Sequence, residues 1–371
     1  MGAELFGARL LAEVKEQNLS DILREFRESR GESVVGRILL GIKPLDDILS
    51  VLARSNTLPS NPVIEITSPF SADGKTSLLY HIAALAVLPA RADDDVHVGG
   101  RGAAVIWLDT DGRFDALRVK QVISHIAQER IVSSHGNSDK RDAKKDEVML
   151  RCLVDEALRH IHVFRPQSSA SLLTTLESII EYMFSIRHYS RQRCVYATIL
   201  DSASAFCWQD WREAEISRIP GARNEGQIHT QHEASSIRQK KDIHVPTEIV
   251  SCLRAIQSTF SCLVLYTTAG FYPSRSISPL LGSFKPYLPH PWPTFPTIRL
   301  IVRRDVVRPF GEWMTVDEAK ADAASRQAVV LSGRFSGWID PSSIPASIKS
   351  ELSAKGAFGF RILKEGIEFN S

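Results

Sequence analysis

The sequence is poor in cysteine, and it lacks both a long apolar run and an excess of charge of either sign. Its five cysteines form no Cys-x-x-Cys pair, which argues against a zinc site and a disulfide framework. No apolar stretch reaches the roughly 20 residues that a membrane-spanning helix needs, and the start lacks the order of a signal peptide. With 45 Lys and Arg against 43 Asp and Glu, net charge does not indicate nucleic-acid binding. We therefore expect an intracellular globular protein without a structural metal.

What the chain does contain is a regular alternation of short apolar runs and helical segments. Continuous apolar runs are typical of strands that are buried on both faces of a sheet. The alternation predicts an α/β fold with a mostly parallel, twisted sheet flanked by helices. The expected strands are 63–66, 103–108, 161–164, 194–200, 262–266, 297–303, 328–331 and 359–363. The expected helices are 75–88, 115–130, 170–187 and 246–259.

The domain organisation follows from where this alternation begins. Residues 1–60 carry apolar residues at helical spacing but are too few for a folded domain, so we expect a short helical N-terminal arm or linker. Residues 61–371 would form the core. Polar insertions interrupt it near 133–147, 212–245 and 305–327, and the second of these is expected to be loop.

The strongest local motif is the turn Pro69-Phe70-Ser71-Ala72-Asp73-Gly74-Lys75-Thr76, directly after one strand and directly before a helix. In a phosphate-binding loop the backbone N–H groups face the phosphates, the lysine reaches the β/γ oxygens and the hydroxyl binds Mg²⁺. The motif therefore predicts ATP with Mg²⁺ as the ligand. The expected nucleotide-binding residues are Asp73, Gly74, Lys75, Thr76 and Ser77.

The loop departs from the usual pattern in two ways. Pro69 replaces its first glycine, or else the loop is one residue longer and begins at Ser68. Asp73 places a carboxylate where a triphosphate would lie. Two unit charges about 4 Å apart cost roughly 4 kcal/mol at an effective dielectric near 20, unless Mg²⁺ or Lys75 screens them. We therefore expect a degenerate loop with weak or absent hydrolysis; the alternative is a turn that keeps the fold without binding nucleotide.

Two further acidic positions complete the pattern. Asp201 ends an apolar strand, where a Walker B acid would hold Mg²⁺ together with Thr76 through the water shell of the metal. The alternative role for Asp201 is a helix cap. Asp111 follows another strand and is the candidate general base, although it is one methylene shorter than the usual glutamate. Asp109 is expected to be structural.

Three segments carry a family resemblance, namely Asp73–His81, Leu108–Arg118 and Ile199–Trp208. With Asp111 in place of glutamate and a Lys-Glu-Gly-Ile-Glu-Phe tail at 364–369, they resemble the eukaryotic RecA-family recombinase paralogues. The resemblance implies a RecA-like P-loop NTPase core and a nuclear role in homologous-recombination DNA repair. It further implies a hetero-oligomer with other paralogues, in which this chain is a non-catalytic or weakly catalytic subunit.

The resemblance also bears on DNA. Ala269 stands where related recombinases place a glutamine that reports the γ-phosphate to the DNA-binding loop, so that coupling is in doubt. Trp208 and Trp211 would either stack on bases or pack at a core or an interface. The stretch 270–308 is basic, and a solvated face or a partner groove would explain it equally well. The candidate residues for contact with single-stranded or branched DNA are Arg275, Lys285, Arg303 and Arg304.

Two other functions stay open from the residues alone. In the first, Lys75, Thr76, Asp201 and Asp111 form an active DNA-dependent ATPase that acts on single-stranded DNA. In the second, the chain is a RecA-like ATPase unrelated to recombination, which the motif resemblances outside the phosphate loop disfavour.

Overall fold

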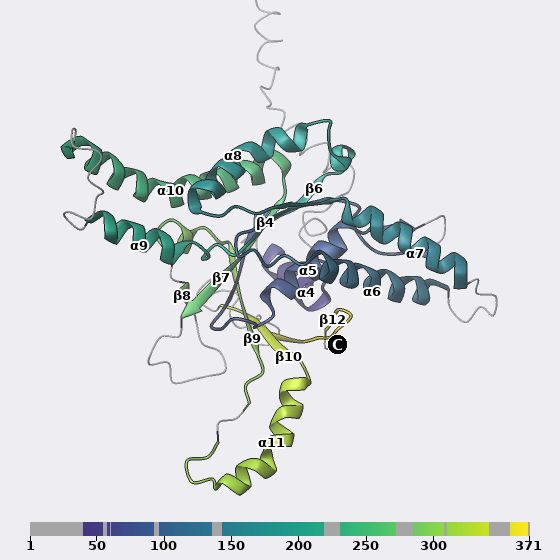
Figure 1. The fold of residues 1–371 in the computed structure, drawn as a ribbon. Helices are drawn as coiled ribbons and strands as arrows, with labels where there is room; N and C mark the ends of the chain where they lie inside the picture. The colour runs from purple at the N-terminus through teal and green to yellow at the C-terminus, as the bar shows by residue number, and fades with distance from the viewer. Residues whose placement is uncertain are drawn as a thin grey trace, which may run out of the picture.

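The computed structural model describes residues 40–54, 58–59, 61–92, 96–135, 143–218, 231–271, 285–286, 288–307, 310–340 and 357–369. Within these residues a ten-stranded sheet has the order β12-β11-β10-β9-β1-β7-β6-β4-β5, with β8 beside β7 (Figure 1). In this order β9, β1, β7, β6, β4 and β5 pair in parallel with one another. Strands β9, β10, β11 and β12 pair antiparallel. The main strands are β1 Val63–Ser68, β4 Ala104–Asp109, β5 Ile161–Phe164, β6 Val195–Asp201, β7 Leu263–Phe271, β8 Lys285–Pro286, β9 Ile298–Arg304, β10 Arg334–Ile339, β11 Ala357–Ile362 and β12 Ile367–Phe369. The predicted α/β class is confirmed.

Helices cover both faces of this sheet. On one face lie α4 Lys43–Arg54, α5 Lys75–Val87, α6 Ala116–His135 and α7 Ala143–Leu158; on the other lie α8 Ser169–Phe184 and α10 Gln231–Phe260. Strand β4 serves both layers, because Val105 and Trp107 join the first core while Ile106 and Leu108 join the second. This double burial explains why the central strands read as continuous apolar runs. No helix in the described ranges is long and apolar enough to span a membrane.

The predicted N-terminal arm, 1–60, is described only in part, since residues 1–39 lie outside the described ranges. Its helix α4 buries Leu45, Ile48, Leu49 and Leu52 in the same core as α5 and β1. The apolar residues of α4 therefore belong to the main core.

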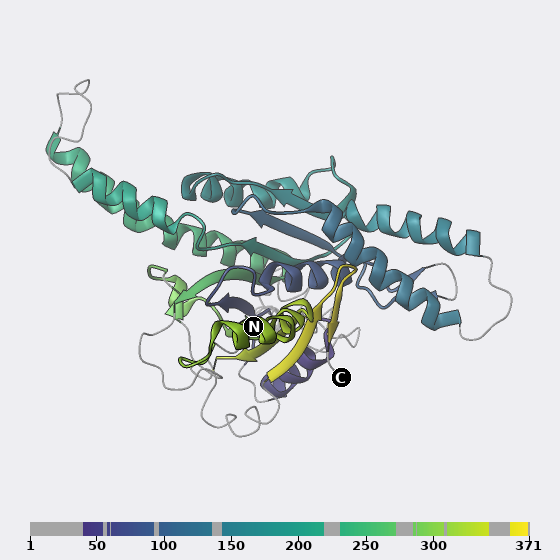
Figure 2. The same cartoon turned by 60° about the horizontal axis from the view of Figure 1, so that its bottom comes forward.

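The prediction that 209–245 is loop is wrong for residues 209–218 and 231–245, and residues 219–230 lie outside the described ranges. Residues 209–218 belong to α9, Cys207–Arg218, and residues 231–245 form the first half of α10, which runs on through Pro246. Figure 2 shows α10 extending beyond the body of the protein. Most described side chains of α9 are exposed, so this helix needs no apolar stripe, and apolar periodicity gave no helical signal there.

The predicted strand 328–331 is also wrong, because these residues end helix α11, Val316–Leu331. A capping box starts this helix: the Thr315 hydroxyl accepts from the Glu318 N–H, and the Glu318 carboxylate accepts from the Thr315 N–H. Alanine-rich sequence then propagates the helix up to Gly333, whose positive φ of 57° ends it before β10. None of the α11 residues is buried, and the helix projects from the sheet (Figure 1).

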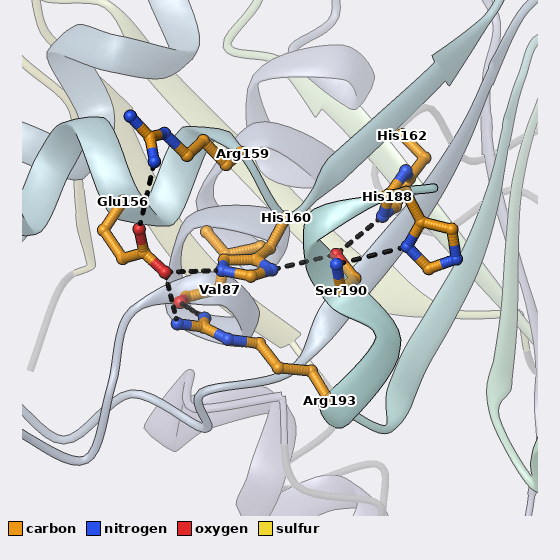
Figure 3. Close-up of polar contacts among 8 residues, drawn as sticks. All are labelled: Val87, Glu156, Arg159, His160, His162, His188, Ser190 and Arg193. Atoms are coloured by element: carbon orange, nitrogen blue, oxygen red, sulfur yellow. Dashed lines mark hydrogen bonds and ion pairs between the residues drawn. The ribbon is translucent and has the colours of Figure 1, made fainter. Parts of the chain in front are cut away.

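A hydrogen-bonded network joins the start of β5 to the segment that precedes β6 (Figure 3). The Ser190 hydroxyl lies 2.8 Å from His160 Nδ1 and 2.7 Å from His162 Nε2. His160 Nε2 lies 2.9 Å from Glu156 Oε1, and His162 Nδ1 lies 2.9 Å from the Tyr182 hydroxyl. One assignment satisfies every contact: both rings are neutral with the proton on Nε2, and Ser190 accepts from His162 and donates to His160.

This network makes stability depend on pH. Burial, with smaller contributions from His188 and His160, lowers the pKa of His162 from 6.5 to about 4. The unfolded chain therefore takes up this proton more readily than the folded chain does. The contribution of His162 to the free energy of unfolding is complete above pH 6.5 and decreases as the pH falls towards 4. At pH 5 the decrease is about 2 kcal/mol, at about 1.4 kcal/mol for each pH unit.

Urea unfolding at about pH 7.5 and about pH 5 measures this decrease. We expect the His162→Gln variant to lose less stability between the two pH values than the wild type, by about 2 kcal/mol. The matched replacement of exposed His97 by glutamine should leave the difference as it is in the wild type. Equal slopes for wild type and His162→Gln would show that His162 does not cause the acid sensitivity.

Candidate nucleotide-binding site

The turn 69–74 joins the end of β1 to the start of α5 at the carboxyl edge of the parallel strands. Gly74 precedes the helix with φ of 91°, a conformation that side chains disfavour. A Cβ at this position would lie 2.9 Å from Ile362 Cδ1 and 3.2 Å from Phe335 Cδ1. β10 and β11 therefore pack closely against the turn, and a side chain at this position would require Ile362 and Phe335 to shift.

Replacing Gly74 by alanine is expected to lower the free energy of unfolding by about 1–3 kcal/mol more than the same change at Gly112. Gly112 also has a positive φ, 66°, but no atom lies within 4 Å of its added Cβ. Both variants carry the backbone strain of a positive φ. Only Gly74→Ala adds a close contact with Ile362 and Phe335. Urea unfolding of the two variants measures the difference, and equal losses would argue against close packing at the turn.

Lys75 is the first residue of α5, and its ammonium group is folded back over the turn. Nζ donates to the Ser68 hydroxyl and lies 3.4 Å from the Phe70 carbonyl oxygen. Burial lowers the pKa of Lys75, and the nearby carboxylates of Asp73, Asp201 and Asp111 oppose this effect. The loop thus brings one cation among three acids, and the Lys75 ammonium is bound by acceptors of the loop itself.

Thr76 and Asp201 meet although they are 125 residues apart in the sequence. The Thr76 hydroxyl donates to Asp201 Oδ2 at 2.8 Å, and the Thr267 hydroxyl donates to Oδ1 at 2.6 Å. Burial raises the pKa of Asp201, and these two hydrogen bonds oppose the increase. Hydroxyl and carboxylate oxygens suit Mg²⁺, whose remaining ligands are commonly water and substrate phosphates. The donor set therefore fits the expected metal.

The two acids after β4 differ in their surroundings. Asp111 is exposed and close enough to act electrostatically on both Lys75 and Asp201. Asp109 is 2% exposed; it accepts hydrogen bonds from the backbone N–H groups of Arg113 and Phe114 and pairs with Arg165 at 3.1 Å. The Asp109 carboxylate thus holds the loop after β4, and Asp111 is the acid on the open side.

The Asp73 carboxylate is held by backbone N–H groups of the loop and of β9. Asp73 is 4% exposed, and its carboxylate accepts from the Phe70 N–H at 2.9 Å and from the Arg304 N–H at 3.1 Å. One contact closes the phosphate loop on itself, and the other ties the loop to the end of β9. Among the three acids, Asp73 has the largest electrostatic effect on the pKa of Lys75, so its negative charge remains part of the site.

Three hydroxyl groups that join the strand ends were not predicted from the sequence. Thr267 bonds to Asp201, as described above. Thr110 donates to the Ser202 carbonyl oxygen at 2.6 Å, and Ser204 accepts from the Ala269 N–H at 3.1 Å. The register of the sheet explains the first of these contacts. β6 and β7 pair in parallel up to Leu200 and Tyr266, so the next residues, Asp201 and Thr267, lie opposite one another. Ala269, which stands where related recombinases place a glutamine, thus contacts the Walker B segment through its backbone N–H.

The structure places two of the four candidate DNA-binding side chains. Arg304 donates to the Val330 carbonyl oxygen at 2.8 Å and lies over the Phe335 ring at 5.8 Å. Arg303 is half-buried in β9. Arg275 and the side chain of Lys285 lie outside the described residues. The Arg304 guanidinium is therefore engaged within the chain at the base of α11.

The tryptophans of α9 lie at the surface. Trp208 and Trp211 are 57% and 52% exposed, and their ring centroids are 6.1 Å apart. The two rings meet edge to face. Packing in the core is thereby excluded for these residues, and the expectations of base stacking and of a partner interface stay open.

A mostly parallel sheet with a Gly-Lys-Thr turn between its central strand β1 and α5 is the architecture of RecA-like α/β proteins. No protein-family model matches the chain. The chain is similar to "DNA repair protein XRCC2 homolog" of Arabidopsis thaliana, with 25% identity over 282 residues in an alignment that covers 67% of this chain and 70% of that protein. It is also similar to "DNA repair protein XRCC2" of Mus musculus, 27% identical over 299 residues, or 80% and 81% of the two chains. The chain is therefore similar over most of its length to DNA repair proteins named XRCC2, and its mostly parallel α/β sheet is that of a RecA-like core.

Proposed function

We propose that this chain is a non-catalytic or weakly catalytic subunit of a nuclear recombinase-paralogue complex that assists homologous-recombination DNA repair. The similarity to XRCC2 supports the repair role. The observation that carries the weak catalysis is the position of Asp73. Its buried carboxylate takes the Phe70 N–H of the loop and adds negative charge beside Lys75, where a triphosphate would need positive charge.

The same geometry supports a nucleotide site of modest strength. Lys75 would hold the phosphates, and Thr76 and Asp201 would hold Mg²⁺, which supplies positive charge against the phosphate oxygens when bound. Gly74 and Ser77 would contribute backbone N–H groups at the helix start. Asp111, on the open side, is the general-base candidate, and its short side chain favours slow hydrolysis.

The partners in this proposal are other recombinase paralogues, together with single-stranded or branched DNA. The exposed pair Trp208 and Trp211 on α9, near the carboxyl end of β6, suits either partner. The Thr76–Asp201–Thr267 geometry favours a second candidate function, a DNA-dependent ATPase that uses these residues with Lys75.

ATP turnover by the purified protein, with and without single-stranded DNA, separates the two candidates. We expect turnover near the background level, which DNA does not stimulate and which Lys75→Ala changes little, because the Asp73 charge beside Lys75 and the short Asp111 side chain both disfavour hydrolysis. Lys120→Ala, on an exposed lysine paired with Asp155, is the matched control. Turnover that DNA stimulates, and that only Lys75→Ala abolishes, would establish the active ATPase instead.

Purification of the tagged chain from nuclear extract tests the assembly. We expect other recombinase paralogues to co-purify in stable proportion. Recovery without any recombination factor would contradict the proposed complex and favour an ATPase that is unrelated to recombination.

A further inference from the structure

The segment 184–193, between α8 and β6, displays large apolar side chains to solvent. Phe184 is 68% exposed, Ile186 is 74% exposed and Tyr189 is 71% exposed. They lie within six residues of one another in the sequence, and we call the exposed side chains of this segment the 184–193 surface. Grouped exposed apolar residues on a folded protein mark interaction sites more often than scattered ones do.

Neighbouring elements support this surface from the side. The Phe184 ring lies 5.6 Å from the ring of Phe260 at the end of α10, at an interplanar angle of 34°. The Arg159 guanidinium, at the end of α7, lies 5.0 Å from the Tyr189 ring centre. Each aromatic ring therefore has one neighbour and keeps most of its area open to solvent.

The buried histidine network fixes the backbone of this surface (Figure 3). His188 Nδ1 accepts from the Ser190 N–H at 3.1 Å, and His188 Nε2 lies 2.9 Å from the Met183 carbonyl oxygen. The hydroxyl of Ser190, 1% exposed, is held between His160 and His162. The chain is thus tied down on both sides of Ile186, which lowers the entropy that a partner would have to remove on binding.

The charges of the segment have one sign. It contains Arg187, Arg191 and Arg193 and no acidic residue. Arg193 bonds to the Val87 carbonyl oxygen and to Glu156, whereas Arg187 and Arg191 are exposed. In the flanking helices, α8 carries Glu177 and Glu181, and the last turn of α7 carries Asp155, which pairs with Lys120, and Glu156, which faces Arg159, Arg193 and His160. The segment itself is therefore net positive.

We propose that the 184–193 surface binds an acidic protein segment that carries an apolar anchor residue. The anchor packs against Phe184 and Ile186, and the acidic residues pair with Arg187 and Arg191. A single-stranded nucleic acid fits less well, because Ile186 offers no ring on which a base could stack and Arg159 covers one face of Tyr189. This role is independent of the nucleotide site, since it uses no residue of the phosphate loop.

Panning a display library of random peptides on the purified wild-type chain tests the proposal. We expect enriched peptides that combine aspartate or glutamate with a large apolar residue. Fluorescence anisotropy of the enriched synthetic peptides is then compared among variants. Phe184→Ser with Ile186→Ser, and separately Arg187→Glu with Arg191→Glu, should each weaken binding about tenfold or more. Trp313→Ser, on a 93% exposed tryptophan beside α11, is the matched control and should bind as the wild type does.

Three results would overturn the proposal. The first is a library that yields no binder, or binders without acidic residues. The second is peptide binding that both double variants retain. The third is tighter binding of a fluorescein-labelled single-stranded oligonucleotide than of any peptide, with loss in the same variants, which would assign the surface to nucleic acid. All the changed side chains are exposed, so circular dichroism should show folded variants throughout.

Discussion

Replacing Arg299 by methionine is expected to lower the free energy of unfolding by about 3–5 kcal/mol. Arg299 Nε lies 2.7 Å from Glu65 Oε2, and its other guanidinium nitrogen lies 3.6 Å from Asp340 Oδ2. Both carboxylates are 0% exposed. Methionine keeps much of the volume of arginine but takes this cation away from the buried Glu65 and Asp340 carboxylates, and removing one partner of a buried ion pair is among the most destabilising changes.

The effect should reach the nucleotide site. Glu65 also accepts from the Thr268 hydroxyl at 2.7 Å, on β7. The preceding residue on that strand, Thr267, points to the opposite face and bonds to Asp201. Glu65 and Asp201 thus hold the end of β7 from its two sides, and loss of the Glu65 network should loosen the Walker B contact.

Urea unfolding of Arg299→Met beside Arg151→Met measures this prediction. Arg151 pairs with Glu147 at 2.6 Å, but both side chains are exposed, so its replacement should cost less than about 1 kcal/mol. Similar losses in the two variants would mean that the buried network contributes no more than a surface ion pair.

Much of the fold could be predicted from the sequence because the central strands are buried on both faces. The apolar runs 63–66, 103–108 and 262–266 are β1, β4 and β7 in the structure. Strands of the antiparallel edge were harder: β10 alternates exposed and buried residues over a glycine-containing segment, and it was missed. Helices that bury little surface, α9 and α11 above all, carry no apolar periodicity and were predicted as loop or strand.

Some residues of the candidate site could likewise be predicted from the sequence, and others could not. Lys75, Thr76 and Asp201 could be placed together because parallel strands end at one edge of the sheet, and the structure brings them together there. The contact of Asp73 with β9 could not be predicted, because this second partner N–H belongs to Arg304, 231 residues further along the chain. The Glu65–Arg299 pair was missed for the same reason, with 234 residues between its members.

The second large effect concerns Lys75 as a ligand for phosphate. Its ammonium lies at the start of α5, above the end of β1, and within the field of Asp201 and Asp111. In this structure it bonds to Ser68 and Phe70, which phosphate oxygens would replace. Removing the ammonium leaves bound phosphates facing three carboxylates without their cation, and such a loss costs about 2–5 kcal/mol of binding free energy.

Calorimetric titration of Mg²⁺ and ATP into the wild type and into Lys75→Ala, with Lys120→Ala as control, tests directly whether this turn is a phosphate cradle. We predict measurable binding to the wild type and to Lys120→Ala, and affinity about 30-fold lower or worse for Lys75→Ala. Equal affinity of wild type and Lys75→Ala, or no heat of binding to the wild type, would contradict a nucleotide site at the end of β1.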